Sequence, residues 1–417
     1  MPQFCAMFWK RILFGLLATS LLSMAQAQPL QSGKWLFTLS RPGGLPVYVQ
    51  ANLQQQGSHY VLAFLNDTET LEINNLRLSG DSLHFDMPLF ETRLGFRIQS
   101  VTQLEGWLLK GTSGEYQRWQ VTGQQTDGPR IPGKVQPPVA NLSGRWAMQF
   151  QRADGSWRPA IAELKQQGNR LTGTIINPSG DYRFLEGRVS GKELYLTAFD
   201  GAHIYAFKAQ ASQDSIVNGV FFSGNAPGDA FKAMRDAKAS LPDVTAAAAG
   251  MKSGESRLQF RFPDLDSNMV SLTDDRFKGK VTIVQIMGSW CPNCMDETKF
   301  LSDYYNGQKM PQVEIVSLAY ELSTDFTRSA ASLRKFKQRF NVRYPMLITG
   351  VKSADPDKAA KTLPQLTDIK YFPTTIFIDK QGRVRKVHNG FYGPGAPEYF
   401  EAFKKEFYAT MQALLAE

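Results

Sequence analysis

Cysteine is scarce in this chain, which has 3 among its 417 residues. Cys5 lies in a predicted leader, so Cys291 and Cys294 are the sulfurs expected in the mature protein. Two thiols are too few for the disulfide framework that stabilises many small secreted domains. A pair placed three positions apart, with no cysteine spent elsewhere, instead indicates redox or metal chemistry.

Long hydrophobic runs are also lacking. The apolar run 12–24 follows Lys10 and Arg11 and covers about 13 residues, whereas a membrane span needs roughly 20. The run ends at 25–27 in the small-x-small pattern of a signal peptidase site, so we expect residues 1–27 to be a signal peptide. The mature chain is then periplasmic or otherwise exported, in an oxidising compartment. An uncleaved leader that anchors the chain to the membrane is the alternative.

Basic residues are not gathered into a run. Lys and Arg number 47 against 38 Asp and Glu, a formal net charge of +9, but they are dispersed along the chain. We therefore expect a solvated basic surface and no nucleic-acid partner. With 42% hydrophobic and 20% charged residues, the composition is that of a globular protein long enough for two or three domains.

The first half of the chain contains an internal repeat with a constant spacing. Three segments recur without a gap, at offsets of 143 − 32, 164 − 53 and 190 − 79, each 111 residues. The repeated pairs are 32–35 with 143–146, 53–57 with 164–168, and 79–83 with 190–194. This constant spacing predicts a duplicated domain.

Each copy is predicted to be an antiparallel β domain of seven or eight strands. Runs rich in β-branched and aromatic residues, at 46–53, 60–65, 170–176 and 193–199, are separated by Gly, Asn, Asp and Ser. Such strands form a small meander, sandwich or barrel. The predicted organisation is repeat 1 at 28–127, a Pro/Gly linker at 128–140, repeat 2 at 141–235, a second linker at 236–255 and a third domain at 256–417.

The repeats offer no recognisable catalytic group. They lack cysteine, and His59, His84 and His203 are scattered singly. Their tryptophans either fill the two cores or line a ligand surface: Trp35, Trp107, Trp119, Trp146 and Trp157. The second option keeps an alternative function open, that of a binding protein whose β domains recognise a partner or a glycan, with an accessory third domain.

The third domain alternates strands and helices. The continuous apolar run 281–287 predicts a buried parallel strand, and helical spacing begins soon after it, from Cys294. Further strands are expected at 313–320, 346–348, 374–379 and 383–388, and helices at 330–340, 357–366 and 397–415. The fold class is therefore two tandem antiparallel β domains followed by an α/β domain. A CxxC between a strand and a helix is typical of thioredoxin-like redox domains.

The two cysteines are predicted to have different roles. At a helix N-terminus, unpaired N–H groups and the helix dipole favour a thiolate, so Cys291 is the candidate nucleophile. Cys294 lies one helical turn on, where it can attack the mixed disulfide that Cys291 forms with a substrate. The product is then released and a Cys291–Cys294 disulfide remains.

Several motifs accompany the cysteines: segments 263–265, 270–272 and 278–280 precede the buried strand, and Trp290 precedes the Cys-x-x-Cys. With these motifs the chain, from about residue 256 onward, resembles TlpA/ResA-like members of the thioredoxin superfamily, exported bacterial thiol-disulfide oxidoreductases. The resemblance implies that Glu297 lies near the cysteines and tunes proton transfer. An acid in the first helical turn that simply suits the helix dipole is the local alternative.

The resemblance also implies a substrate-binding surface. Pro373, which follows Phe372 and precedes an expected strand, matches the family's cis-proline, whose neighbouring backbone holds an extended substrate. A trans proline at a strand start is the alternative. Trp290 is expected to shield the cysteine pair.

The chain departs from ordinary thioredoxins at two places. Pro292-Asn293 stand where those proteins have Gly-Pro, and Gln285 takes the place of their buried aspartate. Since glutamine cannot accept a proton, Glu297 or a water must act as any base for Cys294. The potentials of CxxC proteins span about −270 to −120 mV, so the motif leaves open whether clients are reduced or oxidised.

The sequence lacks residues that two other chemistries require, namely peroxide reduction and zinc binding. A peroxiredoxin-type peroxidase needs a threonine where this chain has Gly288, and a zinc site normally needs four ligands, whereas His388 is the only histidine of the third domain. The sequence thus predicts an exported thiol-disulfide oxidoreductase of the protein-disulfide reductase type, with no metal and no organic cofactor. Its expected partners are client proteins with disulfides or thiols and, from the resemblance, a membrane thiol-disulfide electron donor.

Overall fold

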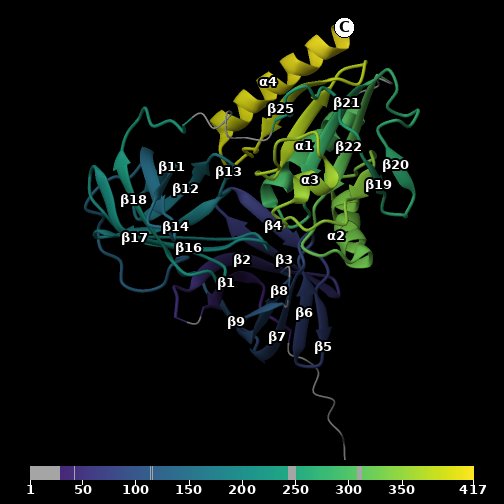
Figure 1. Cartoon of the computed structure of the whole chain (residues 1–417). Coiled ribbons are helices and arrows are strands. Elements are labelled where there is room, and N and C mark those ends of the chain that lie inside the picture. Colours follow the sequence, from purple (N-terminus) through teal and green to yellow (C-terminus); the bar gives the residue numbers. More distant parts are fainter. Residues whose placement is uncertain (1–28, 42, 113, 115, 243–249, 308–311) are drawn as a thin grey trace, which may run out of the picture.

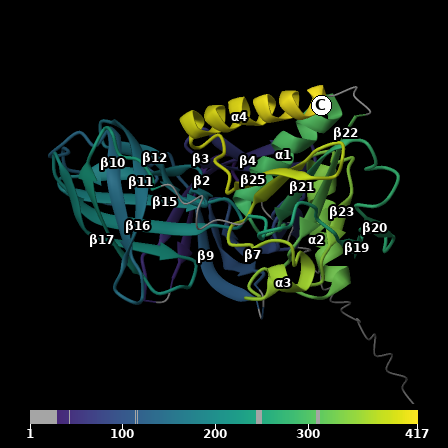
Figure 2. The same cartoon turned by 45° about the horizontal axis from the view of Figure 1, so that its top comes forward.

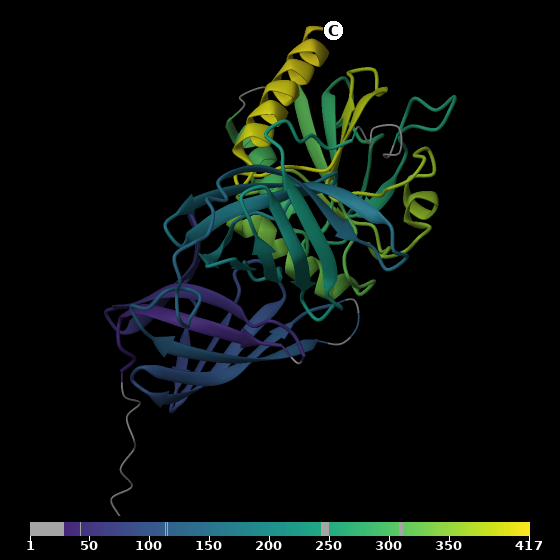
Figure 3. The same cartoon turned by 90° about the vertical axis from the view of Figure 1, so that its left-hand side faces the viewer.

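The computed structural model describes residues 29–41, 43–112, 114, 116–242, 250–307 and 312–417. The predicted signal peptide and Cys5 lie outside the described residues. Two large β sheets and a C-terminal α/β domain make up the described chain, with the second sheet beside both other parts (Figures 1 and 3). Among the helices of this described part, none has the length and apolar character needed to cross a bilayer.

The first sheet has nine antiparallel strands that fold up and down. Their order is β4-β3-β2-β1-β9-β8-β7-β6-β5. Alternate residues of β1, such as Trp35, Phe37 and Leu39, are buried, as expected where one face of a sheet covers a core. The strands are β1 (Gly33–Ser40), β2 (Val47–Gln56), β3 (His59–Asn66), β4 (Glu69–Ile73), β5 (Arg77–Ser79), β6 (Ser82–Asp86), β7 (Thr92–Ser100), β8 (Gln103–Lys110) and β9 (Gln117–Gln125).

The second sheet also has nine strands, and an extra pairing between β11 and β12 closes it into a barrel-like sheet. The sequence predicted seven or eight strands per copy, which is fewer than the nine strands observed in each sheet. Strands as short as β5 and β13 are too brief to leave a hydrophobic alternation in the sequence. The strands are β10 (Gly144–Gln151), β11 (Trp157–Gln167), β12 (Arg170–Asn177), β13 (Gly180–Asp181), β14 (Leu185–Ser190), β15 (Glu193–Phe199), β16 (Ile204–Ala211), β17 (Ser215–Ser223) and β18 (Asp229–Arg235).

The C-terminal domain is built on a five-stranded sheet of order β23-β22-β21-β24-β25, with a small hairpin, β19–β20, outside it. The central strand is β21, which is buried on both faces. The strands are β19 (Arg261–Pro263), β20 (Met269–Ser271), β21 (Val281–Met287), β22 (Val313–Ala319), β23 (Met346–Ile348), β24 (Thr374–Ile378) and β25 (Val384–Asn389). The helices are α1 (Pro292–Gly307), α2 (Phe326–Arg339), α3 (Lys358–Thr362) and α4 (Pro397–Ala416).

Side chains of β21 alternate between two apolar clusters. Ile283 packs with residues of α1, α2 and α4, whereas Val284 packs with α3 and with the segment that precedes the sheet. This alternation follows from the two-residue period of a strand. Figure 2 shows α4 along one side of the domain, with its first turn nearest the second β sheet. There Arg145 pairs with Glu398 at 2.6 Å.

Two helices of this domain differ in extent from the sequence expectation. Helix α2 begins at Phe326, four residues before the expected start, because the Asp325 side chain accepts a hydrogen bond from the Arg328 N–H at 2.8 Å and caps the helix. Helix α3 covers five residues instead of the expected 357–366. Both differences lie at helix ends, where local capping decides the boundary.

The segment between the two β sheets is fastened to both of them. Arg130 is 5% exposed, and its guanidinium donates to the Leu65 carbonyl at 2.6 Å, to Asn66 Oδ1 at 3.0 Å and to Thr197 Oγ1 at 3.1 Å. Glu186 lies 3.6 Å from the same guanidinium. The segment that the composition marks as a linker therefore contributes a buried cation to the contact between the sheets.

Replacement of this cation should destabilise the contact between the sheets. We expect Arg130→Met to lower the free energy of unfolding by about 3 to 5 kcal/mol, because it removes three buried hydrogen bonds and one of the two cations that pair with Glu186. The measurement is urea unfolding followed by tryptophan fluorescence. The matched control is Arg97→Met, whose ion pair with Asp81 is exposed and should contribute about 1 kcal/mol or less. Equal losses in the two variants would contradict this role for Arg130.

Candidate active site

The first cysteine of the CxxC caps the N-terminus of α1. Its Sγ accepts a hydrogen bond from the Cys294 N–H at 3.2 Å, and its carbonyl accepts from the Met295 N–H at 3.0 Å. A side-chain acceptor at this position meets the partial positive charge of the helix end. The Cys291 thiol also donates to the Phe372 carbonyl at 3.6 Å, and the Phe372–Pro373 peptide is cis. The strand β21 that precedes the motif and the loop before β24 thus meet at this sulfur.

Both cysteines are free thiols, so the structure holds the pair in its reduced form. Cys291 is 6% exposed and Cys294 is 0% exposed. Burial raises the pKa of Cys294, and its contact with Cys291 raises that pKa further. A thiol of this kind needs a proton acceptor before it can attack a disulfide.

Glu297 lies in the buried interior behind the cysteines. Gln285 Nε2, on β21, donates to its carboxylate at 2.9 Å, and Thr375 Oγ1, on β24, donates to the other oxygen. Burial raises the pKa of Glu297 from its ordinary value of 4.5 to about 7, and these two hydrogen bonds oppose the shift. The glutamate is therefore not an exposed acid of the first turn, and it contacts the glutamine at the place of the thioredoxin aspartate.

Trp290 and Phe372 pack together over the first cysteine. Trp290 is half-buried, and its indole N–H donates to the Tyr320 carbonyl at 2.9 Å. The rings of Trp290 and Phe372 meet edge to face, with centroids 5.4 Å apart. The residues singled out from the sequence thus lie in the turn before α1, in α1 itself and in the loop before β24, and these segments meet at the start of α1. The residues are Trp290, Cys291, Cys294, Glu297, Phe372 and Pro373.

A second buried carboxyl group lies beside the motif, and no pattern in the sequence marked it. Glu321 accepts hydrogen bonds from the Ser289 N–H at 2.8 Å and from its hydroxyl at 2.6 Å. Burial raises the pKa of Glu321 to about 7. The two residues are 32 positions apart, so only the parallel pairing of β21 with β22 brings them together.

The second β sheet contacts the CxxC directly. Asn293, between the two cysteines, donates to the Phe391 carbonyl at 2.8 Å. Gly180 of β13 packs on this pair so closely that a Cβ there would be 2.6 Å from the Phe391 oxygen and closer still to Asn293 Nδ2. Next to it, the Asp181 carboxylate accepts from the Gly393 N–H at 2.6 Å. A hairpin end of the second sheet therefore covers one side of the redox motif.

A buried arginine links the same helix to both sheets. Arg183, which follows β13, donates to Asp296 on α1 and to Glu69 on β4, and Asp200 lies 3.6 Å from its Nε. Phe90 and Ala202 belong to the apolar cluster that contains Cys291. Both parts of the chain thus contribute to the apolar cluster around the start of α1.

Comparison with known proteins places the C-terminal part of the chain. The family model described as Redoxin matches residues 236–402. The thiol-disulfide oxidoreductase ResA of Bacillus thuringiensis is 27% identical over 134 residues, which are 32% of this chain and 68% of that protein. ResA of Geobacillus thermodenitrificans is 27% identical over 137 residues, 33% of this chain and 69% of that one. The C-terminal region is a TlpA/ResA-like thioredoxin-superfamily domain.

The Redoxin match and the ResA relatives also confirm that the chain is an oxidoreductase enzyme. The reading as a binding protein with an accessory redox domain is not favoured, because each of these relatives is an oxidoreductase. Among solved structures, a putative thiol:disulfide interchange protein DsbE from Chlorobium tepidum aligns with a TM-score of 0.30 at 20% identity, covering 39% of this chain and 99% of that one.

The contact between Gly180 and Asn293 of the CxxC leads to a test. We expect Gly180→Ala to displace Asn293 and the Phe391 backbone, because the added Cβ has no room. Alkylation of Cys291 by iodoacetamide in the native state should then become several-fold faster. The control is Gly155→Ala, since Gly155 also has a positive φ, +83°, but nothing lies within 4 Å of the added Cβ. An unchanged alkylation rate would show that the sheet does not protect the sulfur.

The raised pKa of Glu297 predicts a pH-dependent stability. In the folded protein the group keeps its proton up to pH about 7, whereas in the unfolded chain it ionises above about 4.5. The folded state therefore binds more protons in this window, so its free energy of unfolding falls as the pH rises from about 4.5 to about 7. Relative to Glu297→Gln, the wild type should lose roughly 3 kcal/mol over the window. Parallel pH profiles in urea unfolding would contradict the burial of an ionisable acid here.

Proposed function

We propose that this chain is an exported thiol-disulfide oxidoreductase that exchanges electrons with client-protein disulfides through Cys291 and Cys294. The observation that carries the proposal is the position of the Cys291 sulfur. It lies 3.2 Å from the Cys294 N–H at the helix end and 3.6 Å from the Phe372 carbonyl, beside Pro373. The ResA relatives, which are thiol-disulfide oxidoreductases, support the same reaction.

The reaction proceeds in two exchanges of sulfur partners. The Cys291 thiolate attacks one sulfur of a client disulfide, so an S–S bond forms between enzyme and client and the second client sulfur leaves as a thiolate. Cys294 then attacks Cys291, which forms the Cys291–Cys294 disulfide and releases the first client sulfur. The client gains two electrons and the enzyme pair loses them. In the reverse direction the same steps oxidise a client dithiol.

Two groups near the sulfurs have assigned roles. Glu297 follows Cys294 by one helical turn and, with a pKa of about 7, can accept the Cys294 proton when the second exchange begins. The backbone of Phe372, next to Pro373, holds the extended client segment against Cys291. Trp290 shields the pair from solvent through its packing on Phe372.

We propose the reductive direction, as in a protein-disulfide reductase. A reductase in an oxidising compartment must be recharged, and a membrane thiol-disulfide electron donor is the proposed source. Export rests on the signal-peptide pattern of residues 1–27. The electrons reside on sulfur, so the reaction requires no metal and no organic cofactor.

We also propose that the two β sheets arose by duplication, as repeat 1 at 28–127 and repeat 2 at 141–235. Several local contacts recur at the 111-residue spacing. Gly33 pairs with Leu53 as Gly144 pairs with Leu164. The Trp35 indole donates to the Gln31 carbonyl at 2.9 Å, and the Trp146 indole donates to the Leu142 carbonyl at 2.9 Å. These recurrences support a common origin.

Serine variants of the two cysteines test the reaction. Cys291→Ser should abolish reduction of hydroxyethyl disulfide, a small neutral substrate, because it removes the nucleophile. Cys294→Ser should still attack but accumulate as a mixed disulfide, detected by the mass of the adduct. A Cys291→Ser protein that keeps its rate would sink the proposal. For the wild type, a reduction potential near −270 mV supports the reductive direction, whereas one near −120 mV supports disulfide donation.

A further inference from the structure

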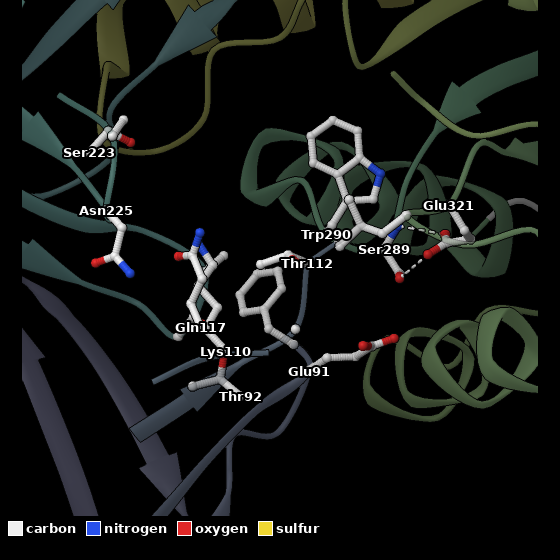
Figure 4. A pocket seen from close by; sticks show the side chains of 17 residues that line it. Glu91, Thr92, Lys110, Thr112, Gln117, Ser223, Asn225, Ser289, Trp290 and Glu321 are labelled. Carbon is white, nitrogen blue, oxygen red and sulfur yellow. Dashed lines mark hydrogen bonds between the residues drawn. The ribbon is translucent and has the colours of Figure 1, made fainter. Parts of the chain in front are cut away.

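All three parts of the chain meet at a cavity of about 500 Å³ next to the redox motif (Figure 4). Figure 4 shows Lys110 and Gln117 between Asn225 on one side and Trp290 on the other. The polar lining comes from every part: Glu91, Thr92, Lys110 and Gln117 from the first sheet, Ser223 and Asn225 from the second, and Ser289 and Glu321 from the Redoxin domain. We call this space the three-domain cavity.

The three-domain cavity lies beside the reactive sulfur. Trp290, which precedes Cys291 in the chain, forms part of its wall. Phe90 and Ala202 line the cavity and also belong to the apolar cluster that contains Cys291. A group bound in the cavity therefore contacts Trp290, the residue next to Cys291 in the chain.

Two of the three charged side chains in the cavity wall are already compensated. Arg328 donates to both oxygens of Glu91, at 2.7 to 3.1 Å, so that carboxylate has its counter-ion. Glu321 is bound by Ser289 through two hydrogen bonds, and its burial favours the neutral acid. Glu91 therefore leaves no uncompensated negative charge for a ligand, and Glu321 is mainly uncharged below pH about 7.

Lys110, at the end of β8, is the third charged side chain of the cavity wall, and it lacks a direct partner among the described residues. Within the described ranges its ammonium makes neither a hydrogen bond nor an ion pair. Asp200 acts on it only at longer range, and burial lowers the pKa of Lys110. A partly buried ammonium without a partner is unfavourable unless a ligand supplies an acceptor. The cavity therefore presents one positive charge together with neutral amide and hydroxyl groups.

We propose that the three-domain cavity binds the part of an extended client segment that adjoins the target cysteine, and that Lys110 selects segments with an acidic residue in that part. This inference rests on the proposed function and specifies its substrate class. A volume of about 500 Å³ accommodates a few residues of extended chain and not the convex surface of a folded client. Gln117, Asn225 and Ser223 supply side-chain groups that can hydrogen-bond a peptide backbone.

The first test compares two synthetic peptides. Each carries one cysteine in a disulfide with 2-mercaptoethanol, and the peptides are identical except that the cysteine is flanked by aspartates in one and by lysines in the other. We measure the second-order rate constant for their reduction by the pre-reduced full-length mature protein in a single turnover, which needs no added reductant. The wild type should prefer the acidic peptide about tenfold or more, the size expected for a charge-assisted hydrogen bond.

Variants of Lys110 assign that preference to one side chain. Lys110→Met should abolish it, Lys110→Glu should reverse it, and Lys110→Arg should retain it. The matched control is Lys165→Glu, which makes the same charge change at an exposed position of β11 outside the cavity. Equal rates on the two peptides in the wild type, or equal shifts in Lys110→Glu and Lys165→Glu, would overturn the inference. If Lys110→Glu does not fold, a preference retained in Lys110→Met overturns it as well.

Two further probes separate this inference from the proposed function. Hydroxyethyl disulfide carries no charge, so its reduction by the wild type reports the sulfur exchange apart from charge recognition. Loss of this reaction in the wild type would count against the redox function itself. Binding of the acidic peptide with serine in place of cysteine, measured by calorimetry, involves no sulfur exchange. It should be about tenfold weaker in Lys110→Met, and equal binding would overturn the cavity proposal whatever the redox result.

Discussion

The buried guanidinium of Arg183 holds the three parts of the chain together at the helix that carries the cysteines. It contacts Glu69 of the first sheet and Asp296 of α1, with Asp200 of the second sheet 3.6 Å away. Each carboxylate would be strongly unfavourable in this interior alone, and so would the cation. The groups can be buried only together, which couples the position of α1 to the docking of both sheets. Asp296 follows Cys294 by two residues, so the redox motif is held by the same constraint.

Burial around the start of α1 explains the electrostatics of the site. Cys294, Glu297 and Glu321 all have raised pKa values, and burial is the largest cause for each. A carboxyl group with a pKa of about 7 can exchange a proton near neutral pH, whereas an exposed one would stay ionised. Burial in the Redoxin domain, where Gln285 and Thr375 contact Glu297, therefore sets the proton chemistry of the motif.

In both sheets most strands pair with their neighbours in the sequence, but the two sheets contact the Redoxin domain differently. The second sheet is closed, and its β13 hairpin end packs on Asn293 and on the loop at Phe391. The first sheet reaches the domain through Glu91, which pairs with Arg328 on α2, and contributes Lys110 to the cavity. The second sheet therefore supports the motif, and both sheets contribute to the pocket wall.

Local pattern was enough to place most elements of the Redoxin domain. The apolar run 281–287, the CxxC after it and the amphipathic stripe of α4 are short-range signals, because they depend on strand and helix periodicity alone. The ends of α2 and α3 and the short strands β5 and β13 were missed, since capping and sheet edges decide them. The pairing of Gln285 with Glu297 joins two residues that the sequence had marked separately.

The sequence by itself determined the redox motif, the TlpA/ResA-like identity of the C-terminal domain and the 111-residue repeat. Only the tertiary structure decided that the two β sheets pack against the motif, through Gly180, Arg183 and the three-domain cavity. Gly180 lies 113 positions before Asn293, and no local pattern links a turn glycine to a distant helix end. The physical reason is that burial of an ion cluster and the fit between surfaces are properties of the assembled chain. Periodicity reports which face of an element is apolar, but not which partner covers it.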